Sequence, residues 1–577
     1  MIKIAIVGFG PRGLHALEQL LLNLSKHDFK KKFEISIFEV NTELGTSFVW
    51  NTQQPDINLA NISNKHLKEL HGRPKIEINN ITIPNFPNYD EWNKNNNTQN
   101  NIANIETFPS RNQIGKYLRE RANTLINILK NAEIVTVINS CVAAINLNED
   151  KFNITTQNTD YFNFDEVLLT VGHQPTKIDA DILEYETQLP SSTFKCFSET
   201  YPIKNIIDSH DIKKTDNVAI RGMGLAMLDA MRALTVARGG YFKIEDNNTL
   251  KCNFSTSPKV PKKIVLYSLD GLIMAPKPLN ETINKLFEIN EKQADYFKYK
   301  TQAAANKPLS VNDNYFLKHT IADIATEVYL KIENRYAPEI NDIDSIKTCI
   351  IHWLDNQKHN HELIESTDNK PELIISNFVE MACNQSAISL DYCVGQVWKH
   401  CQPILYKTFS HAEISEEVIA SVILLDETLK RYSYGPPVQS MQQLLALHRS
   451  NIVSFQFCDN PKISTEKNEL IFTKQTDSIT INVLINSVLS TPKISEVTTL
   501  LIKNLLRNDL IQPIHSKLGI HTNKNGTVIS KNTSKPINLS VLGRLAKGSV
   551  VGVDAILECF GTRINDWAIG VIKRISN

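Results

Sequence analysis

The feature that most constrains the fold is a glycine-rich turn that follows a short apolar segment at the N-terminus. Residues 2–7 (IKIAIV) are mostly apolar, which predicts a strand buried on both faces, as in a parallel sheet. Residues 8–13 carry the pattern GxGxxG, and leucines recur at helical spacing over residues 14–24. A second strand is expected over residues 33–40. The segment therefore predicts a βαβ unit that binds a dinucleotide at its first turn.

Each glycine of this turn has a separate physical role. Gly8 permits the tight turn, Gly10 lets a diphosphate approach the backbone, and Gly13 lets helix and strand pack closely. The N-terminus of the following helix favours negative charge. Glu39, at the end of the next strand, is expected to accept hydrogen bonds from a ribose hydroxyl. A turn without a ligand is the alternative, which the flanking strands and the acidic residue disfavour.

A second strand, turn and helix begin near residue 217. Gly222 and Gly224 form the turn, but Met227 occupies the position where a third small residue favours close packing. Asp270, at the end of the following strand, is expected to bind the adenosine ribose of a nicotinamide cofactor and to disfavour a 2′-phosphate. The alternative is a domain that keeps the fold and no longer binds a nucleotide.

The chain as a whole is expected to be an α/β protein with two Rossmann-like dinucleotide-binding units, for FAD and NAD(P), and a helical insertion. Long helical patterns interrupt the strands between the second unit and the C-terminal part. The expected boundaries are residues 1–210 for the first part of the FAD-binding domain, 211–278 for the NAD(P)-binding unit, 279–450 for the helical insertion and 451–577 for the return to the FAD-binding domain.

Composition favours a small-molecule partner. Lys and Arg together number 62, as do Asp and Glu, so no net charge attracts nucleic acid or an anionic membrane. The sequence has no leader pattern and no apolar run of about 18 residues, so we expect a cytoplasmic protein. The nine cysteines form no CxxC pair, which disfavours a disulfide framework and a zinc site. Nothing in the sequence sets the oligomeric state.

One cluster of residues invites a metal or nucleophile interpretation. Trp398, His400, Cys401 and His411 lie close together in the sequence. No acidic third ligand has a fitting spacing, and the region has a helical pattern. We therefore expect a packed helix surface and no metal site.

Five segments together resemble the FAD-NAD(P)-binding family of flavoproteins: IAIVGFGPRGLHALEQLL, FPSRNQIGKYLRER, TVGHQP, GMGLAMLDAMRALTVARGG and LGRLAKGSVVGVDAILECFG. The resemblance covers most of the chain outside residues 280–450. Members of this family that are similar to the chain include flavin-dependent N-oxygenases that oxidise the amino group of L-aspartate. The resemblance thus implies an FAD enzyme that acts on a small amino acid.

The resemblance also implies positions for the cofactors. Asn61 is expected near the flavin, and Gly172 is expected to close over the diphosphate region. Gly543 and Asp554 are expected to line the flavin from the C-terminal segment. The resemblance places FAD on Gly8, Gly10, Pro11, Arg12, Gly13 and Glu39, and the nicotinamide cofactor on Gly222 and Gly224.

The chain departs from the family pattern after the strand that precedes Asp270. Relatives often carry Ser-Arg-Arg-Gly at this point, whereas this chain has Ser268-Leu269-Asp270-Gly271. Because the arginines are missing, NADH is favoured over NADPH.

Reduced flavin reacts with oxygen and passes an oxygen atom to an amine, so the protein needs mainly to exclude water and orient its substrate. The carboxylate of an amino acid needs a cation, and Arg111, Arg238 and Lys277 are the candidates near family motifs. Each is also plausible as a surface or structural residue. His173, beside Gly172, is a candidate for moving protons at neutral pH, with a loop histidine as the alternative. Arg111 and His173 are thus the expected catalytic residues.

These features predict an FAD-dependent, NAD(P)H-using monooxygenase that takes O2 and oxygenates the amino group of a small amino acid, with L-aspartate as the candidate substrate. A flavin oxidase or dehydrogenase without oxygen insertion is the first alternative. A non-catalytic FAD-binding scaffold is the second, because the second turn is incomplete and the arginine pair is missing.

Overall fold

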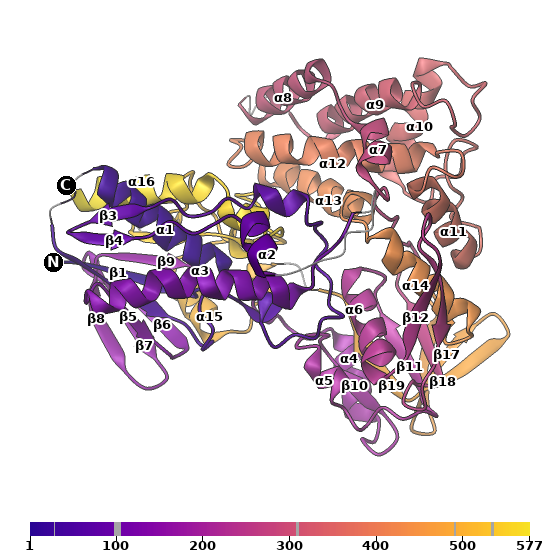
Figure 1. The fold of residues 1–577 in the computed structure, drawn as a ribbon, viewed down its shortest axis with the longest axis horizontal. Helices are drawn as coiled ribbons and strands as arrows, with labels where there is room; N and C mark the ends of the chain where they lie inside the picture. The colour runs from indigo at the N-terminus through magenta and orange to yellow at the C-terminus, as the bar shows by residue number, and fades with distance from the viewer. Residues whose placement is uncertain are drawn as a thin grey trace.

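The computed structural model of the chain consists of two α/β units and a helical region (Figure 1). The first unit lies at the left of the figure with both termini, the helical region at the upper right and the second unit at the lower right. The predicted α/β class with two parallel sheets and a helical region is confirmed. The structure describes residues 1–27, 29, 31–96, 106–306, 311–489, 492–531 and 536–576.

The first sheet is parallel throughout and has the strand order β20-β9-β1-β2-β5. Its central strand pairs Ile4 with Ile35 on one side and with Glu166 on the other. The strands are β1 (Ile2–Val7), β2 (Phe33–Phe38), β5 (Val135–Ile138), β9 (Glu166–Leu169) and β20 (Leu539–Val541).

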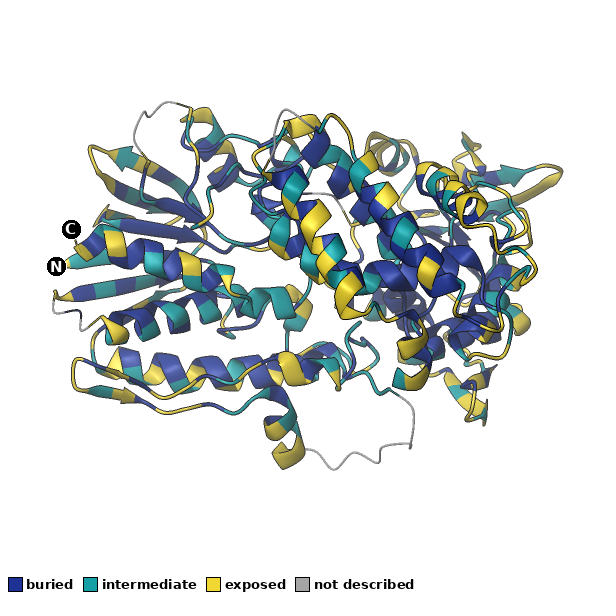
Figure 2. Ribbon diagram, turned by 90° about the horizontal axis from the view of Figure 1, so that it is seen from above, coloured by how far each residue is buried: buried dark blue, intermediate teal, exposed yellow. Residues whose placement is uncertain are grey.

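Helices cover one face of this sheet, and a small antiparallel sheet lies against the other. Helix α1 (Pro11–Lys26) packs beside α16 (Arg563–Ser576), so the two ends of the chain share one apolar core (Figure 2). Helix α3 (Arg111–Asn131) adds Leu125 and Leu129 to this core. Helix α15 (Leu500–Arg507) belongs to the core on the opposite face. The antiparallel strands there are β6 (Val142–Asn148), β7 (Lys151–Thr156) and β8 (Asp160–Phe164).

The second sheet is also parallel and has the strand order β10-β19-β11-β14-β15. Its strands are β10 (Lys195–Phe197), β11 (Asn217–Arg221), β14 (Lys263–Tyr267), β15 (Val453–Ser454) and β19 (Val483–Asn486). Helix α6 (Leu225–Leu234) follows β11. This is the second strand, turn and helix expected from the sequence.

The strand pairings differ from the expected boundaries at two places. Strand β10, expected in the first domain, hydrogen-bonds to β19 in the second sheet. Residues 453–486, expected to return to the first domain, supply β15, β19 and an antiparallel sheet of β16 (Lys462–Glu466), β17 (Glu469–Lys474) and β18 (Asp477–Ile481) to the second unit. The chain rejoins the first unit at Ile494, which belongs to that unit's core. The physical reason is that β11 and β14 need partners on both sides, and sequence proximity does not say which strands provide them.

The helical region does not stand apart from the second unit, because one continuous apolar core runs through both. Trp353 and Trp398 are fully buried within it. The helices are α7 (Glu281–Asn284), α8 (Glu291–Ala305), α9 (Tyr315–Tyr329), α10 (Ile343–Asp355), α11 (Pro371–Ala382), α12 (Leu390–Thr408), α13 (Glu416–Ser433) and α14 (Val438–Arg449). The remaining elements are α2 (Tyr89–Asn96), α4 (Ala180–Gln188), α5 (Lys204–Ile207), β3 (Ile76–Ile78), β4 (Ile81–Ile83), β12 (Tyr241–Asp246), β13 (Lys251–Ser255) and short 3-10 turns.

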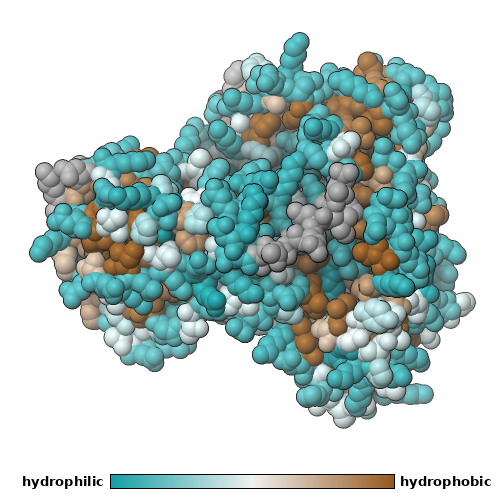
Figure 3. Space-filling model, viewed as in Figure 1, coloured by the Kyte–Doolittle hydropathy of each residue, from teal (hydrophilic) through white to brown (hydrophobic). Residues whose placement is uncertain are grey.

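The face shown in Figure 3 is mainly hydrophilic, with separate hydrophobic areas over both α/β units. Among the described residues, no helix combines the length and apolar character needed to cross a membrane.

Candidate functional site

The first glycine-rich turn is tightly packed against the strands beside it. Gly8 has a φ of +85°, and a Cβ on it would lie 2.8 Å from the Thr170 carbonyl oxygen. A Cβ on Gly10 would lie 3.0 Å from the Thr46 carbonyl oxygen. A Cβ on Gly13 would lie 2.7 Å from the Gly8 carbonyl oxygen. Since backbone atoms cannot move aside easily, the turn requires glycine at Gly8 and Gly13.

The N-terminus of α1 points its first N–H groups out of this turn. The helix begins at Pro11, whose missing N–H is no loss in the first helical turn. No side chain caps the helix at Gly10. The first N–H groups of the helix and its dipole therefore suit a diphosphate.

Glu39 lies beside the turn and is 6% exposed. Its Oε2 accepts a hydrogen bond from the Phe9 N–H at 2.5 Å, and its Oε1 accepts one from the Asn41 N–H at 2.8 Å. These two bonds fix the carboxylate at the carboxyl end of β2. Each oxygen keeps a further lone pair, which fits the expected bond from a ribose hydroxyl.

Gly543 brings the C-terminal segment onto the first turn. It has a φ of +103°, and a Cβ on it would collide with the Arg12 guanidinium. Arg12 Nη2 also donates to the Val553 carbonyl oxygen at 3.4 Å. The positive φ favours glycine at Gly543, and the two predicted FAD residues lie together.

Asp554 is the centre of an ion cluster. Its carboxylate lies 2.7 Å from Arg544 Nη1, 2.8 Å from Lys430 Nζ and 3.2 Å from Lys547 Nζ. Burial would raise the pKa of Asp554, but Lys547, Lys430 and Arg544 hold it well below its usual range. The carboxylate is therefore ionised, and through Lys430 it ties α13 to the first unit.

Gly172 and His173 follow β9 at the same edge of the sheet. Gly172 has a φ of +67°, and no atom lies within 4 Å of the position of its missing Cβ. Surrounding protein atoms and the charge of Arg544 lower the pKa of His173 to about 4, against the effect of Asp554, although the residue stays open to solvent. The ring is therefore neutral at pH 7 and beside the C-terminal segment.

Asn61 and Lys277 join three parts of the chain. Asn61 Nδ2 donates to the Tyr434 carbonyl oxygen at 2.7 Å, and Lys277 Nζ donates to the Asn61 carbonyl oxygen at 2.6 Å. The Lys277 N–H donates to the Pro436 carbonyl oxygen at 3.0 Å. The loop that holds Asn61 thus meets the C-terminal end of α13 and the segment before α7.

Arg111 is engaged in a buried ion pair between the two α/β units. Its Nη2 lies 2.8 Å from Asp229 Oδ2 on α6, and its Nη1 donates to the Tyr201 hydroxyl at 3.0 Å. The Tyr201 hydroxyl in turn donates to Asp229 at 2.5 Å. Burial opposes the charge, but Asp229 and Tyr201 raise the pKa of Arg111 above its usual value. A substrate carboxylate at Arg111 would have to share the guanidinium with Asp229.

Arg238 makes its described hydrogen bonds to backbone carbonyl oxygens. Its guanidinium donates to Ile212 at 3.0 Å, to Ser209 at 3.1 Å and to Ile206 at 3.2 Å. Gly239 then ends the short helical turn with a φ of +90°. These contacts give Arg238 a structural role in the loop before β11, and they do not connect it with the first turn.

The second glycine-rich turn is more open than the first. Gly222 has a φ of +99°, and a Cβ on it would lie 3.0 Å from Ser487 Oγ. No atom lies within 4 Å of the Cβ position at Gly224, and no side chain caps α6 there. Met227 is buried in the core, where it fills the space beside the helix. The helix N-terminus remains available to an anion.

Asp270 is held at the end of β14 by local hydrogen bonds. Its Oδ1 accepts from Ser268 Oγ and from the Leu272 N–H, both at 3.1 Å. Leu269 is 75% exposed. These bonds fix the carboxylate in the loop that follows β14, the strand paired with β11.

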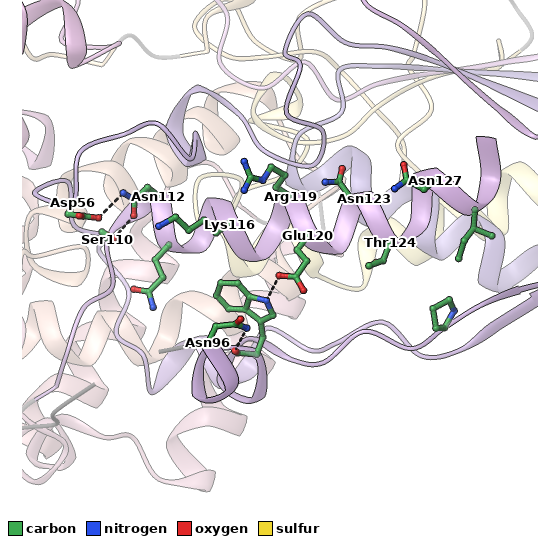
Figure 4. Close-up of a pocket in the computed structure, with 14 residues that line it drawn as sticks. Asp56, Asn96, Ser110, Asn112, Lys116, Arg119, Glu120, Asn123, Thr124 and Asn127 are labelled. Atoms are coloured by element: carbon green, nitrogen blue, oxygen red, sulfur yellow. Dashed lines mark hydrogen bonds between the residues drawn. The ribbon is translucent and has the colours of Figure 1, made fainter. Parts of the chain in front are cut away.

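A separate cavity of about 820 Å³ runs along the outer face of α3 (Figure 4). Asn112 Nδ2 donates to Asp56 at 2.7 Å at one end, and Trp92 Nε1 donates to Glu120 at 2.7 Å along its wall. The rest of the lining combines amide and hydroxyl side chains such as Asn123 with the basic Lys116 and Arg119 and a few apolar residues. It contains none of the predicted cofactor-binding residues.

The segment that holds Trp398 and Cys401 lies in α12, and both side chains are fully buried. His411 Nδ1 lies 3.1 Å from the Thr522 carbonyl oxygen. Among the residues that the structure describes, no group of three or more His, Cys, Asp or Glu side chains is arranged to hold a metal ion.

Sequence reasoning missed three residues that the structure brings to this region. Thr170 Oγ1 donates to the Gly8 carbonyl oxygen at 2.5 Å and closes the first turn. Besides burial, Lys399 lowers the pKa of Lys277, and both lysines lower the pKa of His66 against the effect of Glu106, so Lys399 and His66 belong to the surroundings of Lys277. Lys399 stands between two residues that the sequence did single out, Trp398 and His400, and that position was its one available signal.

Comparisons with known proteins agree with the first turn. The model of the FAD-NAD(P)-binding family matches residues 5–174, which confirms the resemblance for that segment. Nitrosuccinic acid synthase of Aspergillus oryzae is 26% identical over 254 residues. The match spans 42% of this chain and 37% of that relative, so the chain corresponds to little more than a third of the relative's length.

Solved structures are similar over the whole chain at low identity. L-lysine 6-monooxygenase from Pseudomonas syringae aligns with a TM-score of 0.45 and 11% identity, and 100% of each chain is covered. Bacillithiol disulfide reductase from Staphylococcus aureus aligns with a TM-score of 0.41 and 12% identity, and 99% of each chain is covered.

Proposed function

We propose that the chain is a flavin-dependent monooxygenase that binds FAD at the first turn and oxygenates the amino group of a small amino acid, with L-aspartate as the candidate. The observation that carries the proposal is the first turn itself, in which Gly8 and Gly13 are sterically required and α1 is uncapped. The family match over residues 5–174 and the similarity to a nitrosuccinic acid synthase support it.

The residues of the first unit fit FAD. The N-terminus of α1 and the backbone at Gly10 would hold the diphosphate, and Glu39 would accept a ribose hydroxyl. Gly172 leaves open space above the carboxyl end of β9. Arg12 would remain against Gly543 and add positive charge to the same region. Bound FAD supplies the electrons and the reactive centre for oxygen transfer to an amine.

The protein's own part in the reaction is to exclude water, hold the substrate and handle protons. His173, with its pKa lowered to about 4 by surrounding protein atoms and Arg544, is neutral at pH 7 and has a ring nitrogen that can accept a hydrogen bond from the substrate. Asn61 would orient the substrate from the loop before α3, where its Oδ1 has no hydrogen-bond partner among the described residues.

We propose NADH as the reductant, bound at the second turn. The uncapped N-terminus of α6 at Gly224 suits a diphosphate, and Asp270, in the loop after β14, would accept hydrogen bonds from the adenosine ribose. A carboxylate there repels a 2′-phosphate, and Leu269 adds no positive charge.

The experiment that tests the proposal is the absorption spectrum of the purified chain, followed by anaerobic titration with NADH and then NADPH. Flavin bands that bleach with NADH at lower concentration than with NADPH are expected. Oxygen consumption with L-aspartate, and product analysis for an N-oxygenated acid, would then separate a monooxygenase from an oxidase that releases an imine and peroxide. A protein that cannot be reconstituted with FAD would overturn the proposal. Bound flavin that neither nucleotide reduces would favour the scaffold alternative.

A further inference from the structure

Two lysines from distant parts of the chain, Lys277 beside Asn61 and Lys399 beside Asn284, lack an acidic partner at salt-bridge distance among the described residues. Lys277 Nζ donates to the Asn61 carbonyl oxygen at 2.6 Å, and Lys399 Nζ on α12 donates to Asn284 Oδ1 on α7 at 2.8 Å. Both lysines are half-buried. Among the described residues, no carboxylate lies at salt-bridge distance from either ammonium group. Residues 97–105, which the structure does not describe, contain no Asp or Glu.

The electrostatic environment shows that basic groups gather here. Burial and the charge of Lys399 lower the pKa of Lys277 to about 7, against the effect of Glu106. Burial also lowers the pKa of Lys399. The pKa of His66 is lowered by burial and by both lysines, and the pKa of His400 falls to about 4 through burial and Lys399. Burying several basic groups together without an anion costs free energy of folding.

The acidic residues near the cluster form no salt bridge with either lysine within the described part of the chain. Glu281 lies 2.8 Å from Lys65 Nζ, so it already has a basic partner. Glu106, Glu281 and Glu288 raise the pKa of Lys399, and Glu106 also raises that of Lys277, but burial outweighs them and lowers both. An incoming anion would therefore not have to displace a carboxylate from either lysine.

Two buried polar atoms beside the lysines have no hydrogen-bond partner within the described part of the chain. They are Asn61 Oδ1, which can only accept a hydrogen bond, and His400 Nε2. Buried polar atoms nearly always have a partner, so each of these two atoms is open to a hydrogen bond with a water molecule or a ligand. An amino acid carries an anion for the lysines and an N–H donor for Asn61.

We propose that Lys277 and Lys399 bind the carboxylates of a small dicarboxylic amino acid, whose amino group donates to Asn61 Oδ1. This inference rests on the proposed function and identifies the cations that recognise its substrate. It also gives the helical region a direct role, because α12 supplies Lys399. Two ammonium groups select a dicarboxylate over a monocarboxylate, since each carboxylate gains a charged hydrogen bond.

The lowered pKa of Lys277 links ligand binding to proton uptake. An anion beside Lys277 favours its charged form and so raises its pKa. At about pH 8 the free protein holds Lys277 largely neutral, because the pKa is lowered to about 7. Binding of the dicarboxylate should therefore take up a proton at about pH 8 and take up little at about pH 6.

The test is calorimetric titration of L-aspartate, succinate and L-asparagine into the purified full chain at about pH 8, in two buffers of different ionisation enthalpy. Wild type is expected to bind L-aspartate with proton uptake, and L-asparagine at least tenfold more weakly. Lys277→Met and Lys399→Met should each weaken L-aspartate binding at least tenfold, since a charged hydrogen bond is lost (about tenfold to a hundredfold). Lys407→Met, at an exposed position of the same helix, is the matched control and should leave binding unchanged.

Thermal unfolding of each variant separates a lost ligand contact from a folding defect. Removing a half-buried, unpaired lysine should leave the melting temperature unchanged or raise it, whereas a misfolded variant would melt lower. Equal affinity of wild type and both methionine variants would overturn the inference, as would equal affinity for L-aspartate and L-asparagine. Flavin content is read separately from the absorption spectrum. A flavin-loaded protein without affinity for L-aspartate would refute this inference and leave the proposed function standing. A protein that binds L-aspartate but no flavin would refute the proposed function and leave this inference standing.

Discussion

Asp229→Asn should destabilise the contact between the two α/β units, because it removes the charge that neutralises Arg111. The two side chains are 11% and 3% exposed, and Nη2 lies 2.8 Å from Oδ2. Arg232 Nη1 lies 3.8 Å from the same carboxylate, so the variant leaves two buried guanidinium groups without a counter-charge. Breaking a buried pair in this way costs about 3–5 kcal/mol. Arg111→Met should cost less, about 1–3 kcal/mol, because Tyr201 still donates to Asp229.

A double-mutant cycle measures the pair itself. Urea unfolding of wild type, Asp229→Asn, Arg111→Met and the double variant should give a coupling free energy of about 2–3 kcal/mol. The exposed pair Lys94–Asp90 is the control, with 2.7 Å between Nζ and Oδ2 and 69% and 26% exposure, and its coupling should stay below about 1 kcal/mol. A coupling free energy for Arg111 and Asp229 as small as the control value would refute the conclusion that they form a stabilising buried ion pair. If Arg111 instead binds substrate, Arg111→Met would raise KM while Asp229→Asn leaves it unchanged.

Two further results follow from the first unit. Gly13→Ala should abolish FAD binding, because its Cβ would lie 2.7 Å from the Gly8 carbonyl oxygen. Gly224→Ala should fold normally, because no atom lies within 4 Å of its Cβ position. Flavin content and melting temperature check both variants, and a flavin-loaded Gly13→Ala protein would contradict the packing argument. Burial opposes the charge of Glu18, yet Arg121 at 2.8 Å, together with His15, lowers the pKa of Glu18 to about 2. The ionised carboxylate therefore stabilises the folded protein fully above the unfolded pKa of about 4.3, and this stabilisation is lost as the pH falls towards 2. Glu18→Gln should therefore lower the free energy of unfolding at pH 7 by about 3–5 kcal/mol and flatten its fall below about pH 5, and a variant curve parallel to wild type in that range would refute this.

The local elements of both glycine-rich turns could be predicted because their signals are close together in the sequence. Strand β1, the turn at Gly8 and the start of α1 occupy consecutive residues, and steric requirements within that segment decide the conformation. The same holds for β11 and α6. The identity of the glycines and the acid at Glu39 therefore carried the dinucleotide prediction.

The membership of strands in the second sheet could not be predicted in the same way. Strands β10, β15 and β19 are short, and their hydrogen-bond partners lie far away in the sequence. A periodic pattern shows that a segment is extended, but not which neighbour it pairs with. For that reason the sequence did not show that β15 and β19 pair in the second sheet.

The sequence by itself determined that the chain has two glycine-rich turns at helix N-termini, because backbone sterics act between near neighbours. Tertiary structure alone decided the partners of the charged residues. It paired Arg111 with Asp229, seated Arg12 on Gly543 and brought Lys399 towards Lys277. Coulombic and packing contacts depend on distance in space, and the folding of distant segments onto one another sets that distance.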